Sequence, residues 1–378
     1  MACKYLRGKP ELKHGVISSQ IPPLQVTVSS QPLDTLSPVK QPWTAPRAMV
    51  AICSDLDETP DAETYFELMR FLNTTEQTAM GTGVGLEVGN TIYFDMAPGQ
   101  FSYWNTTEPN REKIRALIRS GHIDCLHSFG DLATTRAHAA RALEELQKHD
   151  CRIRVWIDHA QAITNFGADI MQGQGDQPGH PAYHADLTMA YGIEYVWRGR
   201  VTSVIGQDRP FSLRGIVDAG HPVASAKTLA TEAAKQALAC LGNRKYRLHA
   251  GNRQIRPGTL RDGQPVQEFI RCNPPWGGIG MGDRGDEIQQ VLTPRFLDRL
   301  LERRAPCILY THLGKLNRNR NQRAFSPEAV AAFRLLAEYH HDGRILVTTT
   351  SRLLDASSCQ FPGAPPNRRS SLEFPDLG

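Results

Sequence analysis

The chain has 378 residues, enough for one large domain or two ordinary ones. Its apolar fraction of 40% and charged fraction of 22% are ordinary for a globular protein, and its formal net charge is only +4. This mild charge argues against nucleic acid as a partner. The eight cysteines are scattered without a Cys-x-x-Cys pair, so we expect reduced thiols and no disulfide framework.

The two ends of the chain differ in composition from its middle. Residues 1–46 are rich in Pro, Ser and Gln without a sustained period, which predicts an irregular N-terminal arm. Residues 356–378 are rich in Ser and Pro, and we expect a loose C-terminal tail. The first residues lack the apolar core of a signal peptide, and no segment is apolar enough to cross a bilayer. We therefore expect a cytoplasmic protein with no membrane span; the sequence leaves its oligomeric state open.

Between these ends, short apolar runs alternate with amphipathic segments, which predicts parallel strands joined by crossover helices. The first part holds, in chain order, a strand at 48–53, a helix at 62–72, a glycine-punctuated strand and loop at 78–88, a helix at 111–120, a strand with its exit loop at 121–131, a helix at 134–149, a strand at 153–157, a helix at 186–191 and a strand at 193–197.

A less regular insertion follows at about 212–286. It holds an alanine-rich helix at 226–241, a hairpin turning at Asp262-Gly263 and a long loop at 273–285. The alternation then resumes with a helix at 296–303, a strand at 307–310, a helix at 327–339 and a strand at 344–348. The sequence thus predicts one α/β domain over residues 47–355, with an inserted helix and hairpin.

Polar side chains capable of metal chemistry follow three of the predicted strands, the third of which leads to His312. Asp55 and Asp57 are two apart, so they point to one side of an extended chain. His127 and Asp131 are four apart, so on a helical turn they would chelate one ion. Because sites of parallel α/β folds lie at the carboxyl ends of strands, we expect these loops to meet. One histidine and two carboxylates suit an ion that activates water, and the carboxylate of the Asp-x-Asp pair that stays off the metal would accept the proton.

The order of these segments resembles the polysaccharide deacetylase superfamily (carbohydrate esterase family 4). Asp55 and Asp57 match the Asp-x-Asp form of its first motif, which supplies a base and a metal ligand. Residues 121–131 match the length of its second motif, Gly-His-Glu-Ile-Gly-Asn-His-Ser/Thr-x-x-His, with its Gly-His start and its His-Ser. The run from Leu309 to His312 matches its late Leu-x-x-His motif, which supplies a general acid. These matches occur in order over residues 48–354.

The resemblance implies a distorted (β/α)7-type barrel of parallel strands that holds one divalent metal. It implies Asp57, His127 and Asp131 as metal ligands, with Asp55 as catalytic base and His312 as catalytic acid. The expected ion is zinc, with manganese, cobalt, nickel and iron as alternatives. The implied reaction removes an acetyl or similar acyl group from an amino sugar or a related amide. Water activated by the metal would attack the carbonyl.

The sequence departs from the family pattern at two places. Asp131 stands where the second motif ends in histidine, and Asp158-His159 replaces the expected Arg-Pro loop. The first departure makes the site richer in oxygen, and His159 is a candidate replacement ligand. The second removes the arginine that usually holds the base, and we expect Arg198 or Arg200 to substitute for it.

The sequence also offers candidate substrate-binding residues and two alternative functions. Trp197 and Trp276 are candidate substrate-binding side chains, and the basic run that includes Lys315 and Arg318 could hold an anionic group of a carbohydrate or other small-molecule substrate. Asp55 also begins an Asp-x-Asp-x-Thr pattern typical of haloacid-dehalogenase-type phosphatases, in which it would be a nucleophile beside magnesium. A barrel that binds a glycan without turning it over is the third alternative.

Overall fold

The computed structural model describes residues 48–212, 216–217, 220, 222–274, 284–316 and 323–359. The chain divides into two compact units, Met1–Ser37 and Pro38–Gly378, and all described residues belong to the second. The arm predicted at residues 1–46 and the tail beyond residue 359 lie outside the described residues. Among the described helices, none combines the length and apolar character needed to cross a membrane.

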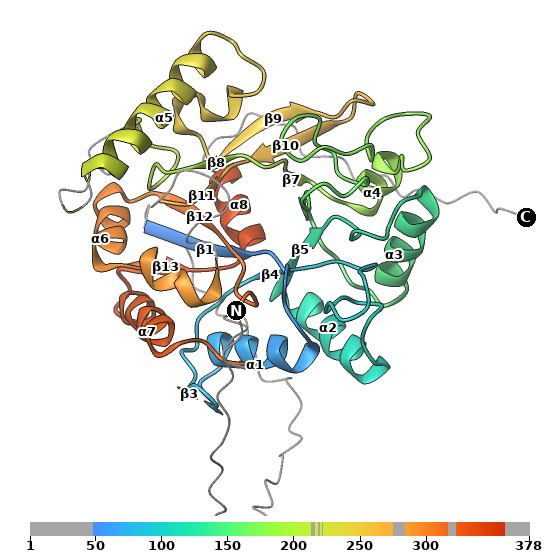
Figure 1. Ribbon diagram of the computed structural model, residues 1–378, viewed down its shortest axis with the longest axis horizontal. Coiled ribbons are helices and arrows are strands. Elements are labelled where there is room, and N and C mark those ends of the chain that lie inside the picture. Colours follow the sequence, from blue (N-terminus) through green and yellow to red (C-terminus); the bar gives the residue numbers. More distant parts are fainter. Residues whose placement is uncertain are drawn as a thin grey trace, which may run out of the picture. The chain divides into compact units, whose positions relative to one another are not determined.

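The second unit is built on a curled, mostly parallel sheet that forms a half-barrel, with helices around its outside (Figure 1). This confirms the predicted α/β class. Within the described residues the sheet has eleven strands. In spatial order they are β8 (Val201–Thr202), β11 (Arg271–Cys272), β12 (Pro306–Thr311), β1 (Ala48–Ser54), β4 (Asn90–Ile92), β5 (Ile123–His127), β6 (Val155–Ile157), β7 (Tyr195–Trp197), β10 (Pro265–Phe269) and β9 (Ile255–Thr259), with β13 (Ile345–Val347) also paired to β1.

Helices connect these strands and begin and end where local chemistry favours it. Asp61 accepts a hydrogen bond from the Thr64 amide at the first helix, and Gly121 ends the second in the left-handed region. The helices are α1 (Ala62–Asn73), α2 (Glu108–Ser120), α3 (Arg136–Lys148), α4 (Ala185–Tyr191), α5 (Pro222–Cys240), α6 (Pro294–Arg303), α7 (Pro327–His341) and α8 (Thr350–Cys359). Short elements complete the described chain: the hairpin β2 (Gln77–Thr78) and β3 (Gly81–Thr82), and the 3-10 turns Arg247–Asn252 and Gly285–Gln290.

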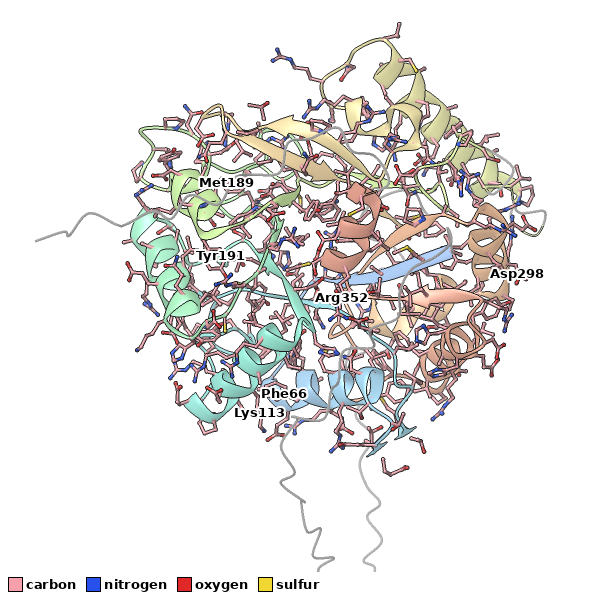
Figure 2. All side chains as sticks on the ribbon, turned by 180° about the vertical axis from the view of Figure 1, so that it is seen from behind. Phe66, Lys113, Met189, Tyr191, Asp298 and Arg352 are labelled. Carbon is pink, nitrogen blue, oxygen red and sulfur yellow. The ribbon has the colours of Figure 1, made fainter. Side chains whose placement is uncertain are left out.

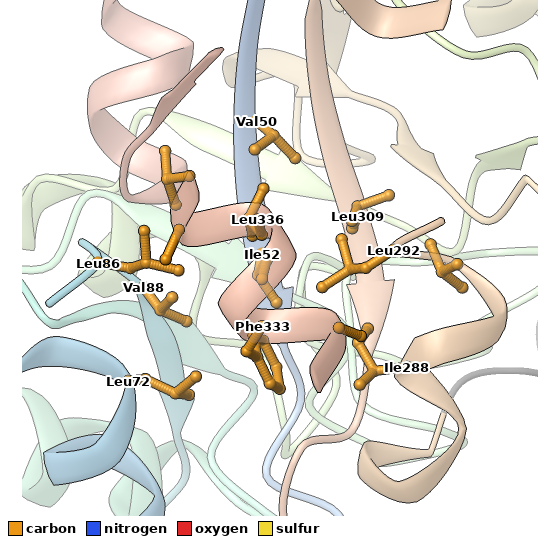
Figure 3. Packing of buried hydrophobic residues seen from close by; sticks show 14 of the residues in the cluster. Val50, Ile52, Leu72, Leu86, Val88, Ile288, Leu292, Leu309, Phe333 and Leu336 are labelled. Atoms are coloured by element: carbon orange, nitrogen blue, oxygen red, sulfur yellow. The ribbon is translucent and has the colours of Figure 1, made fainter. Parts of the chain in front are cut away.

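Apolar side chains bury the outer face of the sheet beneath these helices. Figure 3 shows Val50 and Ile52 of β1 packed against Phe333 and Leu336 of α7. Helices α1 and α2 lie next to each other. Lys113 of α2 is 5.3 Å from the ring centre of Phe66 on α1 (Figure 2). Fully burying one such aliphatic side chain contributes about 1.5–3 kcal/mol, so the stripes that predicted the helices also hold them in place.

Helix α8, which the sequence does not predict, lies inside the curl of the sheet. Its Leu353 and Leu354 are buried in the cluster that fills the inner face. Its Asp355 accepts hydrogen bonds from Arg154 and Tyr195, at the amino ends of two strands. The helix therefore fills the amino end of the half-barrel and leaves the carboxyl end to the polar loops. Residues 356–359, which we expected to begin the loose tail, are instead the last residues of this helix.

The inserted segment contributes to the main sheet. Its hairpin turns at the predicted dipeptide, with β9 and β10 antiparallel, and Gly263 adopts a positive φ of 92°. Strand β10 then pairs in parallel with β7, so the hairpin extends the half-barrel. The sequence analysis did not predict strands β4, β8 and β11, which have only two or three residues each.

We predict that the buried Asp124 makes stability depend on pH. Burial raises its pKa to about 6, against the opposing hydrogen bond from the Ser351 amide. Because the folded state binds this proton more tightly, the stabilisation is present below about pH 4 and is lost as pH rises to 6. Relative to wild type, Asp124→Asn should gain roughly 3 kcal/mol of unfolding free energy between pH 4 and 7, measured by urea denaturation. The control is Asp150→Asn, which changes an exposed carboxyl. If the difference in unfolding free energy from wild type stays constant with pH in both variants, the prediction is contradicted.

Candidate metal centre

Strand register brings the polar loops together at the carboxyl end of the half-barrel. Ser54 pairs with Thr311, so Asp55 and His312 leave neighbouring strands side by side, and the Asp55 amide donates to the Thr311 carbonyl. His127 pairs with Ile157 in the same way, which places His127 beside the loop that carries His159. Parallel pairing thus collects residues separated by more than 250 positions.

Three of these residues form a group that could hold a metal ion. The ligand atoms of Asp57, His127 and His159 all lie within 4.8 Å of one another. His159 Nδ1 is 3.3 Å from His127 Nε2 and 2.9 Å from Asp57 Oδ1. Two ligands of a tetrahedral zinc ion are also about 3.3 Å apart, as follows from bonds of about 2.0–2.1 Å. The group therefore has the spacing and the donor atoms of a metal site.

The polar atoms of this group also fit a metal. Asp57 Oδ1 is buried and, although close to His159, accepts no hydrogen bond from the described residues. Burial lowers the pKa of His127 to about 4 despite the nearby Asp55 and Asp57, so the ring is neutral, as a ligand must be. Burial raises the pKa of Asp57, but His127, His159 and His312 outweigh it and hold that pKa well below its usual value.

Asp131 lies on the far side of His159 and does not join the three-residue group. Its Oδ1 is 3.0 Å from His159 Nε2, whereas His159 Nδ1 faces Asp57. The expected helical turn from His127 to Asp131 does not form, because Ser128 and Gly130 have positive φ values of 52° and 99°. Burial lowers the pKa of His159, but Asp131 and Asp57 raise it to about 10, so a metal ion that binds Nδ1 would displace a proton. Asp131 therefore orients the histidine, as carboxylates often do for metal-binding imidazoles.

Asp55 is held by an arginine that the sequence analysis did not identify. Arg271 of β11 donates to both oxygens of Asp55, at 2.7 and 2.9 Å, and both side chains are buried. The guanidinium lies over Trp197 at 3.5 Å and over Tyr310 at 4.4 Å from the ring centres. Burial lowers the pKa of Arg271, but Asp55 and Cys53 more than reverse this effect. The carboxylate is thus fixed in one orientation by a planar, two-bond contact.

His312 borders the group from the end of β12. Its Nε2 lies 3.3 Å from Asp57 Oδ2 and 3.4 Å from the Tyr310 hydroxyl. Asp55 borders the other histidine, with its Oδ2 3.9 Å from His127 Nε2. The structure thus brings Asp55, Asp57, His127 and His312 into one site, together with His159.

The expectation that Arg198 or Arg200 holds Asp55 was wrong. Arg198 pairs with Glu268 at 2.7 Å, and Arg200 pairs with Asp169. The physical reason is the alternation of a strand: Trp197 faces the inner cluster, so Arg198, the next residue, points to the outer face. Asp158 also turns outward, where it accepts hydrogen bonds from the Trp156 ring and the Phe166 amide.

The substrate-binding candidates fall into three groups. Trp197 is fully buried beneath Arg271, so it shapes the core of the site and offers no open surface. Lys315 is near the site and pairs with Glu58 at 2.7 Å. Trp276 and Arg318 lie outside the described residues.

Sequence reasoning missed Arg271 because it lies in a two-residue strand inside the irregular insertion. The usable signal was its position between two buried residues, Ile270 and Cys272, where an arginine needs a charged partner. His159 was identified as an alternative ligand because Asp131 stands where the family motif has its last histidine.

The chain has only a distant structural similarity to the known protein described below. The sequence matches no protein-family profile and no curated protein. Among solved structures, the fold is similar to a 4-alpha-glucanotransferase from Thermococcus litoralis, with a TM-score of 0.40 and 12% sequence identity. The similarity covers 82% of this chain and 40% of that chain, so this chain spans less than half of its neighbour. A likeness this distant carries no conclusion about activity.

We predict that Asp57→Ala and His127→Ala each abolish metal binding, because each removes one of three ligand atoms. Asp131→Asn should weaken it by about 10–100-fold, since the ligand remains but loses its orienting carboxylate. The measurement is metal content by mass spectrometry, with zinc titration for affinity. His122→Gln is the control, because His122 contacts Ser120 at the opposite end of β5. Full metal content in both alanine variants would contradict the assignment.

Proposed function

We propose that this chain is a metal-dependent hydrolase that removes an acetyl or similar acyl group from an amino sugar or a related amide. The observation that carries the proposal is the arrangement of one potential metal group, Asp57, His127 and His159, between an arginine-held Asp55 and His312. A hydrolase of this kind needs an ion, a proton acceptor and a proton donor within reach of one bond.

Each residue of this arrangement has a separate task. A divalent ion bound there would activate water and polarise the acyl carbonyl. Asp55 takes the proton from the attacking water, and Arg271 keeps its carboxylate aimed at the reacting centre. His312 gives a proton to the departing amine or alcohol, and the neighbouring Tyr310 hydroxyl supports its ring nitrogen. Burial of these groups strengthens their electrostatic effect, because little water screens them.

The arrangement also supports membership of the polysaccharide deacetylase superfamily as part of the proposal. The two departures from its pattern have counterparts in space. His159 supplies a ligand atom where the second motif ends in Asp131, and Arg271 takes the place of the arginine missing after β6. Among the described residues, the group offers two imidazoles and one carboxylate, a donor set that suits zinc better than magnesium.

We predict that Asp55→Asn lowers kcat by about 10²–10⁴-fold while leaving metal content unchanged, because it removes a proton acceptor and no ligand. Because the substitution also takes the charged partner from Arg271, the folding of the variant is checked by urea denaturation. His312→Gln should do the same for the proton donor. Turnover is measured as acetate release from a panel of N-acetylated amino sugars with zinc-loaded protein. The matched control is Asp150→Asn, which changes an exposed carboxyl and should keep full turnover.

One outcome would reject the role of Asp55, and another would reject the proposed function. Acetate release that survives in Asp55→Asn would exclude Asp55 as the base. Magnesium-dependent phosphate release from p-nitrophenyl phosphate, lost in Asp55→Asn, would instead favour the phosphatase alternative.

A further inference from the structure

A basic cavity lies beside β7, away from the metal centre. Its volume is about 520 Å³, within the range of small-molecule sites. Its walls come from the end of β7, the β9–β10 hairpin, the segment after α5 and the loop after β6. Among its lining residues six are basic and two are acidic. The basic ones are Arg198, Arg200, Arg244, Lys245, Arg247 and Arg261.

The carboxylates around this cavity are too few to neutralise it. Glu268 is shared, accepting from Arg198 at 2.7 Å and from Arg247 at 3.1 Å. Arg200 pairs with Asp169, and Arg261 pairs with the buried Asp176. Three carboxylates therefore form ion pairs with four of the six basic side chains. Within the described chain, the remaining two, Arg244 and Lys245, form no salt bridge with a carboxylate and are exposed at the rim.

The excess of positive charge is also visible in the hydrogen bonding of Arg200 and in the pKa values of neighbouring basic groups. Arg200 is buried, and its Nη1 has no hydrogen-bond partner among the described residues, so the guanidinium is only partly paired. Burial lowers the pKa of His249 to about 3, and the charges of Lys235 and Arg200 act in the same direction. Burial and the neighbouring arginines also lower the pKa of Arg256. An anion in the cavity would relieve this repulsion.

The cavity and the metal centre lie on opposite faces of the sheet. Trp197 packs in the inner cluster with Tyr310, whereas Val196 belongs to the outer cluster. Arg198 continues the outer side, and its partner Glu268 shares that side with Val266 of the same strand.

From this geometry we infer that the cavity binds a phosphate group, either free or carried by a small phosphorylated molecule. A phosphate dianion offsets more of the excess charge than a carboxylate, and its oxygens match the donor fork of arginine. The volume leaves room for the molecule that carries the phosphate. This site is separate from the proposed hydrolase reaction, and its test does not depend on that activity.

The test is calorimetric titration of the full chain with inorganic phosphate and with glucose 6-phosphate. Chelator-treated protein is used, so that phosphate cannot bind through a metal ion. We expect saturable binding of at least one probe, weakened by about tenfold or more in Arg244→Glu/Lys245→Glu, since two charge-assisted contacts are reversed. These rim residues are chosen because they hold no internal ion pair whose loss would unfold the chain.

The matched control is Lys148→Glu/Arg152→Glu, which makes the same change in net charge at exposed positions near the end of α3. It should leave the affinity unchanged, and so should Asp57→Ala. Tighter binding of glucose 6-phosphate would identify a phosphorylated molecule as the ligand, and tighter binding of inorganic phosphate would identify the free ion. Absence of saturable binding, or equal loss in the rim and control variants, would overturn the inference.

Discussion

The parallel pairing of β1 with β12, and of β5 with β6, is the constraint on which the site depends. Main-chain hydrogen bonds fix the register, and the register decides which loop residues emerge next to one another. A slip of one residue would turn each side chain to the opposite face. The amino end of the same half-barrel is filled by α8, so the cluster at the carboxyl end rests on a packed interior.

Within this frame, breaking the ion pair between Arg271 and Asp55 would be costly. Both groups are almost completely buried, and losing one partner of such a pair costs about 3–5 kcal/mol because a buried charge is left alone. The guanidinium also lies over the aromatic rings of Trp197 and Tyr310. The pair thus ties the first strand of the fold to the inserted segment, and it fixes the orientation of the proposed base.

The two faces of β7 carry different chemistry because successive residues of a strand point in opposite directions. Inward, Trp197 supports the arginine that holds Asp55. Outward, Arg198 joins a cavity in which positive charge exceeds negative charge. One short strand therefore separates the candidate metal centre, which is rich in imidazole and carboxylate, from the basic cavity, which is rich in guanidinium.

By itself, the sequence determined the α/β alternation, most helices, the hairpin turn, and Asp55, Asp57, His127 and His312 as residues at strand ends, because periodicity and strand termini are local properties. Tertiary structure alone decided that His159 faces Asp57, that Asp131 lies behind His159, and that Arg271 reaches Asp55 across 216 positions. It also decided the position of α8 and the gathering of arginines beside β7. These outcomes depend on which strands pair and how far the sheet curls, and such long-range contacts leave no periodic signal in the residues that make them.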